Sequence, residues 1–237
     1  MRLFGMQRDG TAIRSPDAEA AWDAKTKVFM SYSRKDREFV GKLADALEAR
    51  DDMEVLRDTD DILPTDEWRG SLAKLIGEAD TIVFCLSPDS ATSTECAWEV
   101  DLAEKLNKRM APVVVKDVDG RVPGGLAKLN YIFFTARDDF DRALDKLVLA
   151  LNSDIVWIRE HTRLGELSRR WSAAGEPKDQ LLHGGDIAAA VQWTARQPKS
   201  APEPTELTFK FVEASNSKHG ATGTGFRVAR TLLAQKF

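Results

Sequence analysis

Short apolar runs and amphipathic segments alternate along the first two-thirds of the chain. Five runs are rich in strand-forming residues and end in small or polar side chains. They are KVFMSYS (27–33), MEVLRD (53–58), TIVFCLS (81–87), APVVVKDV (111–118) and YIFFT (131–135). TIVFCLS is apolar without alternation, which is typical of a central parallel strand that is buried on both faces.

Helical spacing of apolar residues fills the intervals between these runs. The predicted helices cover 34–52, 68–80, 93 to about 109, and 138–153, the last capped by Asp138 or Asp139. Alternation of strands and helices predicts βαβ units, and therefore an α/β fold with a five-stranded parallel sheet covered on both faces. Sites in such sheets form beyond the carboxyl ends of the strands. The candidate chemistry therefore lies in SYSRKD, RDTDDILPTDEW and SPDSATSTECAWE, each of which follows a strand.

The pattern changes at both ends of this α/β region. Residues 1–26 form an N-terminal extension, and 152–197 are predicted to form a helical extension. Its helices are expected over 153–175 and 184–197, the second capped by Asp186. Residues 198–237 are interpreted as a Pro-rich linker and a short tail, with a glycine-rich turn and a possible strand, FRVARTLL.

Composition narrows the classes of function. A net charge of −4 argues against a nucleic acid or an anionic membrane as partner. No stretch approaches the roughly 20 apolar residues of a spanning helix, and the N-terminus lacks the apolar core of a secretory signal, so a cytoplasmic protein is expected. Cys85 and Cys96 are interpreted as buried thiols in a reducing compartment. The three histidines show no ligand spacing with either cysteine, so no metal site is expected.

Glu99 occupies an unusual place in the predicted helix STECAWEVDL (93–102). At about 100° per residue, it falls within the apolar arc that contains Cys96, Val100 and Ala103. A carboxylate on the core side of a helix is costly unless it is paired or faces a cleft. Taken alone, the position fits an acid that serves the helix dipole or pairs with a buried arginine, as well as a functional acid.

Three segments, in order and spacing, resemble a TIR (Toll/interleukin-1 receptor) domain over about 27–151. KVFMSYSRKD resembles the first box of that family, RDTDDILPTDEWRGSL its second strand and BB loop, and IVFCLSPDSATSTECAWEV its third strand and the helix bearing S-x-x-C-x-x-E. The resemblance implies a flavodoxin-like fold, with the helical extension added after it.

The same resemblance implies an activity. Many TIR domains cleave NAD⁺ at the nicotinamide–ribose bond, which would give nicotinamide and ADP-ribose or a cyclic product. Glu99 corresponds to the glutamate that such enzymes use. Ser33 and Arg34 correspond to positions that line the nucleotide pocket, where Arg34 would meet a phosphate or be a solvated first-turn arginine. Asp58 and Asp60 would bind ribose or order their loop. Trp68 would stack on a base or pack against its own domain, and Ser87 would help to position the helix that bears Glu99. NAD would be the substrate, with no separate cofactor or metal.

Partners and alternatives also follow from the resemblance. TIR–TIR self-association through the loop from Asp60 to Glu67 would activate the enzyme, in signalling or antiphage defence. Two positions depart from the enzymatic pattern: Glu95 stands where an aromatic residue is common, and Ser33 replaces an arginine-like position. A non-catalytic TIR interaction module, acting as an adaptor or mimic, therefore remains an alternative, as does an inert relic of a larger fusion.

The C-terminal segments carry a second resemblance. W-I-R-E-H-T-R-L and P-E-P-T-E-L resemble segments of bacterial TIR proteins that continue into WD-repeat or formylglycine-generating-enzyme-like modules. GFRVARTL resembles the very end of the latter module, which is consistent with a remnant of a shrunken fusion or with a chance octapeptide. Under either interpretation, no sulfatase-modifying activity is expected.

Overall fold

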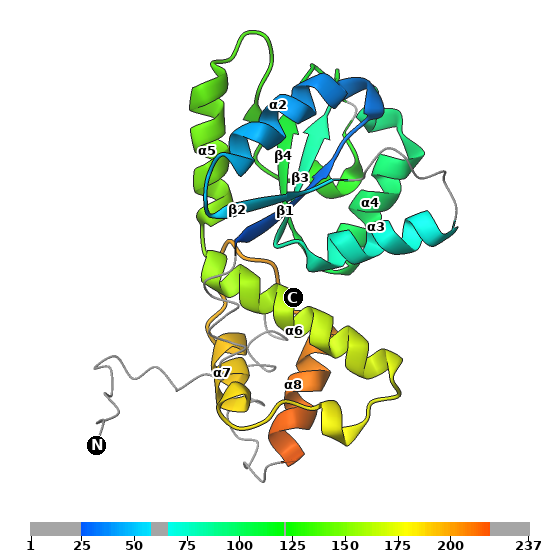
Figure 1. The fold of residues 1–237 in the computed structure, drawn as a ribbon, viewed down its shortest axis with the longest axis vertical. Coiled ribbons are helices and arrows are strands. Elements are labelled where there is room, and N and C mark those ends of the chain that lie inside the picture. Colours follow the sequence, from blue (N-terminus) through cyan, green and yellow to red (C-terminus); the bar gives the residue numbers. More distant parts are fainter. Residues whose placement is uncertain (1–24, 58–65, 121, 219–237) are drawn as a thin grey trace, which may run out of the picture.

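The computed structural model describes residues 25–57, 66–120 and 122–218 (Figure 1). Its centre is one sheet in which all strands are parallel, in the order β2-β1-β3-β4-β5. The strands are β1 (Thr26–Ser31), β2 (Met53–Leu56), β3 (Thr81–Leu86), β4 (Arg109–Val114) and β5 (Ile132–Phe133). The prediction of a five-stranded parallel sheet in a flavodoxin-like α/β fold is therefore confirmed.

Helices cover both faces of this sheet, as Figure 1 shows. Helices α2 (Arg37–Glu48) and α5 (Phe140–Asn152) cover one face, and α3 (Asp66–Glu78) and α4 (Thr94–Lys105) cover the other. Every residue of β3 is buried, with Val83 and Cys85 facing α2 and α5, and Ile82 and Phe84 facing the opposite layer. Burial on both faces is the reason this strand has no polar alternation.

Capping residues fix where the helices of the α/β domain (residues 26–152) begin and end. Asp139 accepts a hydrogen bond from the Arg142 backbone N–H at 2.8 Å, so the second of the two predicted caps begins α5. Helix α4 ends at Lys105, short of the predicted 109, because Asn107 adopts a left-handed φ of 48°. β4 then begins at Arg109.

A helical extension follows the α/β domain and has its own apolar core. It contains α6 (Ile155–Ala173), α7 (Gly185–Thr194) and α8 (Glu206–Lys218). Trp157 of α6 stacks on Trp193 of α7 with ring centroids 4.6 Å apart, and Phe211 of α8 is fully buried in the same cluster. The sequence placed 198–237 in a linker and tail, whereas 206–218 form α8 because its apolar residues join this core. The possible strand FRVARTLL lies outside the described residues.

One predicted cap of the extension is wrong. Gly184, with a φ of 56°, is the N-cap of α7, and Asp186 lies inside its first turn. A glycine reaches this backbone conformation without steric cost, whereas an aspartate two positions later can still favour the helix dipole.

Polar side chains fasten the extension to the amino-terminal edge of the sheet. Lys108, which is 5% exposed, donates through Nζ to the carbonyl oxygens of Gly77 and Ala79, both at 2.7 Å, and to Thr162 Oγ1 at 3.4 Å. Arg109 donates to the carbonyl oxygens of Leu151 at 2.6 Å and Ser153 at 2.5 Å. These bonds satisfy backbone oxygens at the ends of α3 and α5, and the bond to Thr162 links the same lysine to α6 of the extension.

Three-residue 3₁₀ turns complete the described elements. They are η1 (Arg34–Asp36), η2 (Ser90–Thr92), η3 (Gly124–Leu126) and η4 (Lys178–Gln180). η1 follows β1 and η2 follows β3, so both lie at the carboxyl edge of the sheet, where sites form in this fold class.

Candidate functional site

Glu99 lies on α4 with its side chain turned towards the carboxyl end of β1. The residue is 7% exposed, and its Oε2 accepts a hydrogen bond from the hydroxyl of Ser31, the last residue of β1. Ser31 itself is fully buried. The helical angle therefore placed Glu99 correctly on the core side, and β1 supplies a partner that holds the carboxylate.

Cys96 lies one turn before Glu99 on α4 and shares its buried environment. Burial raises the pKa of the Cys96 thiol to about 11, and the nearby charge of Glu99 acts in the same direction. Burial also raises the pKa of Cys85 on β3, with a smaller contribution from Asp36. Both cysteines are buried free thiols, as expected, and neither is activated as a nucleophile.

Asp36 is a second buried carboxylate at this edge, and the sequence patterns did not single it out. Its side chain is completely buried and accepts a hydrogen bond from Ser87 Oγ at 2.5 Å. Lys116 Nζ lies 2.6 Å from its other oxygen. The only sequence signal was its place in SYSRKD, because its partners are 51 and 80 residues away along the chain.

The predicted pocket residues differ in how they are placed. Ser33 caps η1 by accepting from the Lys35 backbone N–H, and Arg34 is exposed on that turn. Ser87 is fully buried at the end of β3 and bonds to Asp36. Ser33, Arg34 and Ser87 therefore lie on the same edge of the sheet as Ser31 and Glu99.

The remaining predicted residues belong to the segment between β2 and α3. Asp58 and Asp60, with most of the loop from Asp60 to Glu67, lie outside the described residues. Trp68 lies in the first turn of α3, and its side chain is likewise outside what the structure describes. Their roles in the pocket stay predictions.

Glu95, the departure from the enzymatic pattern, has a local structural role. Ser93 Oγ and Thr94 Oγ1 donate to its Oε2 at 3.2 Å and 3.1 Å, at the N-terminus of α4. A hydrogen bond from its own backbone N–H and one from Thr94 lower the pKa of this carboxyl. Trp98 does not replace the expected aromatic residue, because it packs half-buried against the cluster that contains Leu72 and Ile76.

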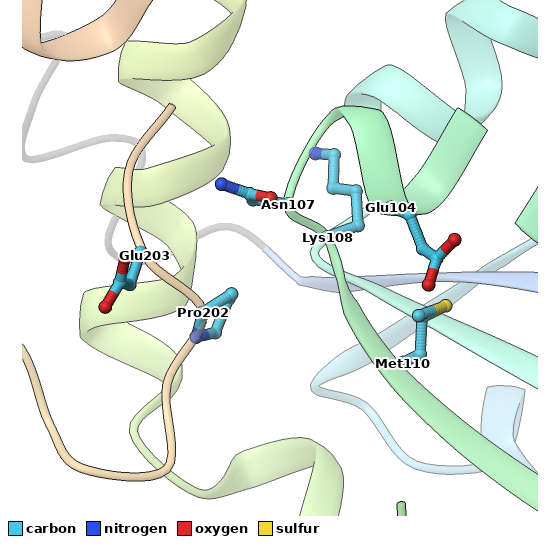
Figure 2. Close-up of a pocket in the computed structure, with 6 residues that line it drawn as sticks. All are labelled: Glu104, Asn107, Lys108, Met110, Pro202 and Glu203. Atoms are coloured by element: carbon cyan, nitrogen blue, oxygen red, sulfur yellow. The ribbon is translucent and has the colours of Figure 1, made fainter. Parts of the chain in front are cut away.

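Two cavities are lined by described residues. One of about 650 Å³ lies beyond the carboxyl ends of β4 and β5, where Phe39, Phe134 and Phe140 meet Lys116. The other, of about 360 Å³, lies at the opposite edge (Figure 2), between the α4–β4 turn and the segment carrying Pro202 and Glu203. Its Lys108 already makes three hydrogen bonds, so this lysine has no donor left for a ligand.

Metal and membrane features are missing from the described part of the chain. Within it, no group of three or more His, Cys, Asp or Glu side chains could hold a metal ion. No helix among these residues combines the length and apolar character that crossing a bilayer needs.

Comparison of the chain with models of known protein families gives one match. The model of the TIR domain family matches residues 28–148, which contain most of β1, all of β2 to β5, Asp36 and Glu99. The chain belongs to the TIR domain family. No curated protein matches it.

Two solved structures are similar to this TIR domain. One is the TIR domain of the Toll-related receptor TRR-2 from Hydra magnipapillata, at 18% identity and a TM-score of 0.45, covering 52% of this chain and 96% of the other. The other contains the TIR domains of the activated Roq1 resistosome, which directly recognises the pathogen effector XopQ. It has 20% identity and a TM-score of 0.42, and covers 54% of this chain and 99% of the other. The extension that follows α5 lies beyond the family match.

Proposed function

We propose that this protein is an NAD⁺ glycohydrolase that cleaves the nicotinamide–ribose bond, with Glu99 as its catalytic carboxylate. The observation that carries the proposal is the placement of Glu99. It is a buried acid on α4, bonded to Ser31 at the carboxyl end of β1, in the S-x-x-C-x-x-E segment of a TIR domain. The TIR family contains both NAD⁺-cleaving enzymes and non-catalytic interaction modules, so the site residues decide between these functions.

The chemistry of the bond explains why a single carboxylate suffices. Cleavage of an N-glycosidic bond builds positive charge on the ribose ring, as in other glycoside cleavages. Nicotinamide leaves a cationic pyridinium as a neutral molecule, so the leaving group needs no general acid. One carboxylate beside the ribose can stabilise the developing charge electrostatically, and burial strengthens that interaction.

The residues around Glu99 at the carboxyl edge of the sheet are assigned roles in this proposal. In the complex with NAD⁺, ribose hydroxyls replace the Ser31 hydroxyl as partners of Glu99. Arg34, exposed on η1, meets a phosphate, and Ser33 lines the pocket beside it. Trp68 stacks on a base, while Asp58 and Asp60 bind ribose or order their loop. Attack of water on the ribose carbon then gives ADP-ribose, whereas attack of the adenine gives a cyclic product.

Assembly is the proposed means of control. We propose that TIR–TIR contacts through the loop from Asp60 to Glu67 complete the pocket and switch on a cytoplasmic signalling or defence enzyme. Activity should therefore rise more steeply than linearly with protein concentration.

The test is nicotinamide release from NAD⁺ by the full chain at high protein concentration. Glu99→Gln keeps an oxygen that accepts from Ser31 but removes the charge, and it should lower kcat by about a hundredfold or more. Asp101→Asn is the matched control, because Asp101 is an exposed carboxylate on the same helix. Equal nicotinamide release from wild type and Glu99→Gln, or no release at any concentration, would refute the enzymatic proposal.

A specific observation favours a second candidate, the non-catalytic TIR interaction module. Glu95 accepts hydrogen bonds from Ser93 and Thr94 at the N-terminus of α4, where enzymatic relatives often have an aromatic ring. This candidate predicts concentration-dependent association with TIR domains that Glu99→Gln does not change. Absence of nicotinamide release together with such association would favour it.

A further inference from the structure

Asp36 brings together the segments that follow three different strands. The carboxylate itself belongs to η1, which follows β1. Ser87, which donates to it at 2.5 Å, follows β3, and Lys116, at 2.6 Å, follows β4. A fully buried carboxylate is tolerated only when it is paired and hydrogen-bonded, and these two partners meet that requirement.

The Ser87 partner leads directly to the helix that carries Glu99. The Ser87 backbone N–H donates to Ser90 Oγ at 2.9 Å, and the Ser90 backbone N–H donates to Ser87 Oγ at 3.1 Å. These reciprocal bonds form the η2 turn, and Ser93 then caps α4 by accepting from the Cys96 backbone N–H at 3.2 Å. The start of α4 is thus connected to Asp36 through a short series of hydrogen bonds.

Strand β1 and the η1 turn after it are therefore both connected to the segment that carries Glu99. Ser31, the last residue of β1, bonds to the Glu99 carboxylate, and Asp36, five positions later, holds the turn before α4. We propose that Asp36 is a positioning residue that sets where α4 begins, and hence where Glu99 meets Ser31. Its consequence for catalysis rests on the proposed function, whereas its consequence for the position of α4 does not.

A surface pair offers a matched control for this proposal. Lys35 Nζ lies 2.6 Å from Asp89 Oδ1 and so spans the same two segments as Asp36 and Ser87. The Lys35 side chain is 74% exposed and that of Asp89 is 35% exposed, so water screens the pair. Asp89→Asn should therefore leave α4 in place, while Asp36→Asn should release it.

The first experiment measures alkylation of Cys96 in the full chain, with mass spectrometry assigning the modified cysteine. Cys96 lies in the first turns of α4, whereas Cys85 lies in the fully buried β3. Asp36→Asn should speed Cys96 alkylation by about tenfold or more without exposing Cys85. The substitution weakens a buried hydrogen bond to a charged group, so the start of α4 opens more often. Lys116→Met should have the same effect, and Lys116→Arg should restore the slow rate because its charge again pairs with Asp36.

Two outcomes would overturn the proposal. In one, Cys96 of the Asp36→Asn variant is alkylated at the wild-type rate. In the other, Cys85 and Cys96 are exposed together, which would indicate a general loss of stability. The second experiment repeats the nicotinamide assay with the same variants, where Asp36→Asn should lower kcat more than it changes KM. A wild type without activity refutes the proposed function alone, because alkylation still tests the position of α4.

Discussion

Glu95 and Glu99 lie one helical turn apart on α4, yet their carboxylates occupy opposite environments. Glu95 is exposed and accepts hydrogen bonds at the helix N-terminus, where negative charge is favourable. Glu99 is buried and bonds to the neighbouring strand. The position expected to carry an aromatic ring thus contributes to the start of the helix. Substitutions of Glu95 and Glu99 should therefore change the stability of the protein in different ways.

Replacement of Glu95 by Gln should lower the free energy of unfolding by about 0.5 kcal/mol at pH 7, the scale of an exposed charge at a helix terminus. The pKa of Glu95 is lowered from its ordinary value of 4.5 by hydrogen bonds from its own backbone N–H and from Thr94. The contribution is therefore complete above pH 4.5 and is lost as the pH falls through the folded-state pKa. Urea unfolding of both proteins at pH 7 and pH 3 checks this; a difference that persists at pH 3 would contradict it.

Residue-level reasoning from the sequence found Glu99 but missed Asp36. The angular position of Glu99 is local, because its apolar neighbours lie within one or two turns of the same helix. Burial of Asp36 depends instead on Ser87 and Lys116, which come from other strands. A polar triplet such as RKD has the composition of an exposed first turn, so only the folded topology identifies its buried member.

At the scale of elements, the C-terminal end of α3 depends on residues outside its own helix. Its last carbonyl oxygens are satisfied by Lys108, from the turn before β4, and Arg169 of α6 lies 3.4 Å from the Gly77 carbonyl oxygen. A helix end that is buried needs such partners. Burial lowers the pKa of Lys108 to about 7, with a further contribution from the charge of Arg169.

Lys108→Met should lower the free energy of unfolding by about 2 kcal/mol at pH 7, because two buried carbonyl oxygens lose their donor. Between about pH 7 and pH 10.5 the unfolded chain holds a proton that folded Lys108 releases, so the contribution of this group rises with pH. The stability difference from wild type should therefore widen from pH 7 to pH 10 in urea titrations. A constant difference would show that Lys108 stays charged in the folded protein.

The elements themselves were largely predictable, and their contacts were not. Strands 81–87 and helix 138–153 were placed within a residue or two, because each has a strong periodicity and clear end signals. Helix α8 was missed because FKFVEAS is short and its apolar residues pack against other parts of the extension. Docking of the extension through Lys108 and Arg109 has no local signature in the sequence.

At the scale of the whole molecule, the α/β domain and the helical extension share a polar boundary. Arg109 joins the start of β4 to Leu151 of α5 and to its C-cap residue Ser153, where the chain passes to α6. Arg159 Nη2 of α6 donates to Thr26 Oγ1 at 3.1 Å. Of the six tryptophans, Trp157, Trp171 and Trp193 lie in the extension and Trp68 and Trp98 lie on helices of the α/β domain, while Trp22 lies outside the described residues. Tryptophan fluorescence therefore weights the extension more heavily than the larger α/β domain, while far-UV circular dichroism reports on both parts.

Wild-type protein should give coincident urea unfolding curves by fluorescence and circular dichroism, because the boundary couples the two parts. In Arg109→Met the fluorescence curve should move to lower urea by about 1 M relative to circular dichroism, since the carbonyl oxygens of Leu151 and Ser153 lose their donor. Arg50→Met is the control, because Arg50 pairs with Asp145 on the surface of the α/β domain. Parallel movement of both curves in Arg109→Met would refute the coupling.

Both outer strands of the sheet are short, since β2 has four residues and β5 has two. An outer strand presents unpaired backbone groups that can recruit strands from other chains, and its length limits how many bonds such pairing can form. Copies of this chain that meet at high concentration thus have little backbone with which to fuse their sheets. Association through loops and side chains can then be undone by dilution, so a protein whose proposed activity depends on assembly can also return to separate molecules.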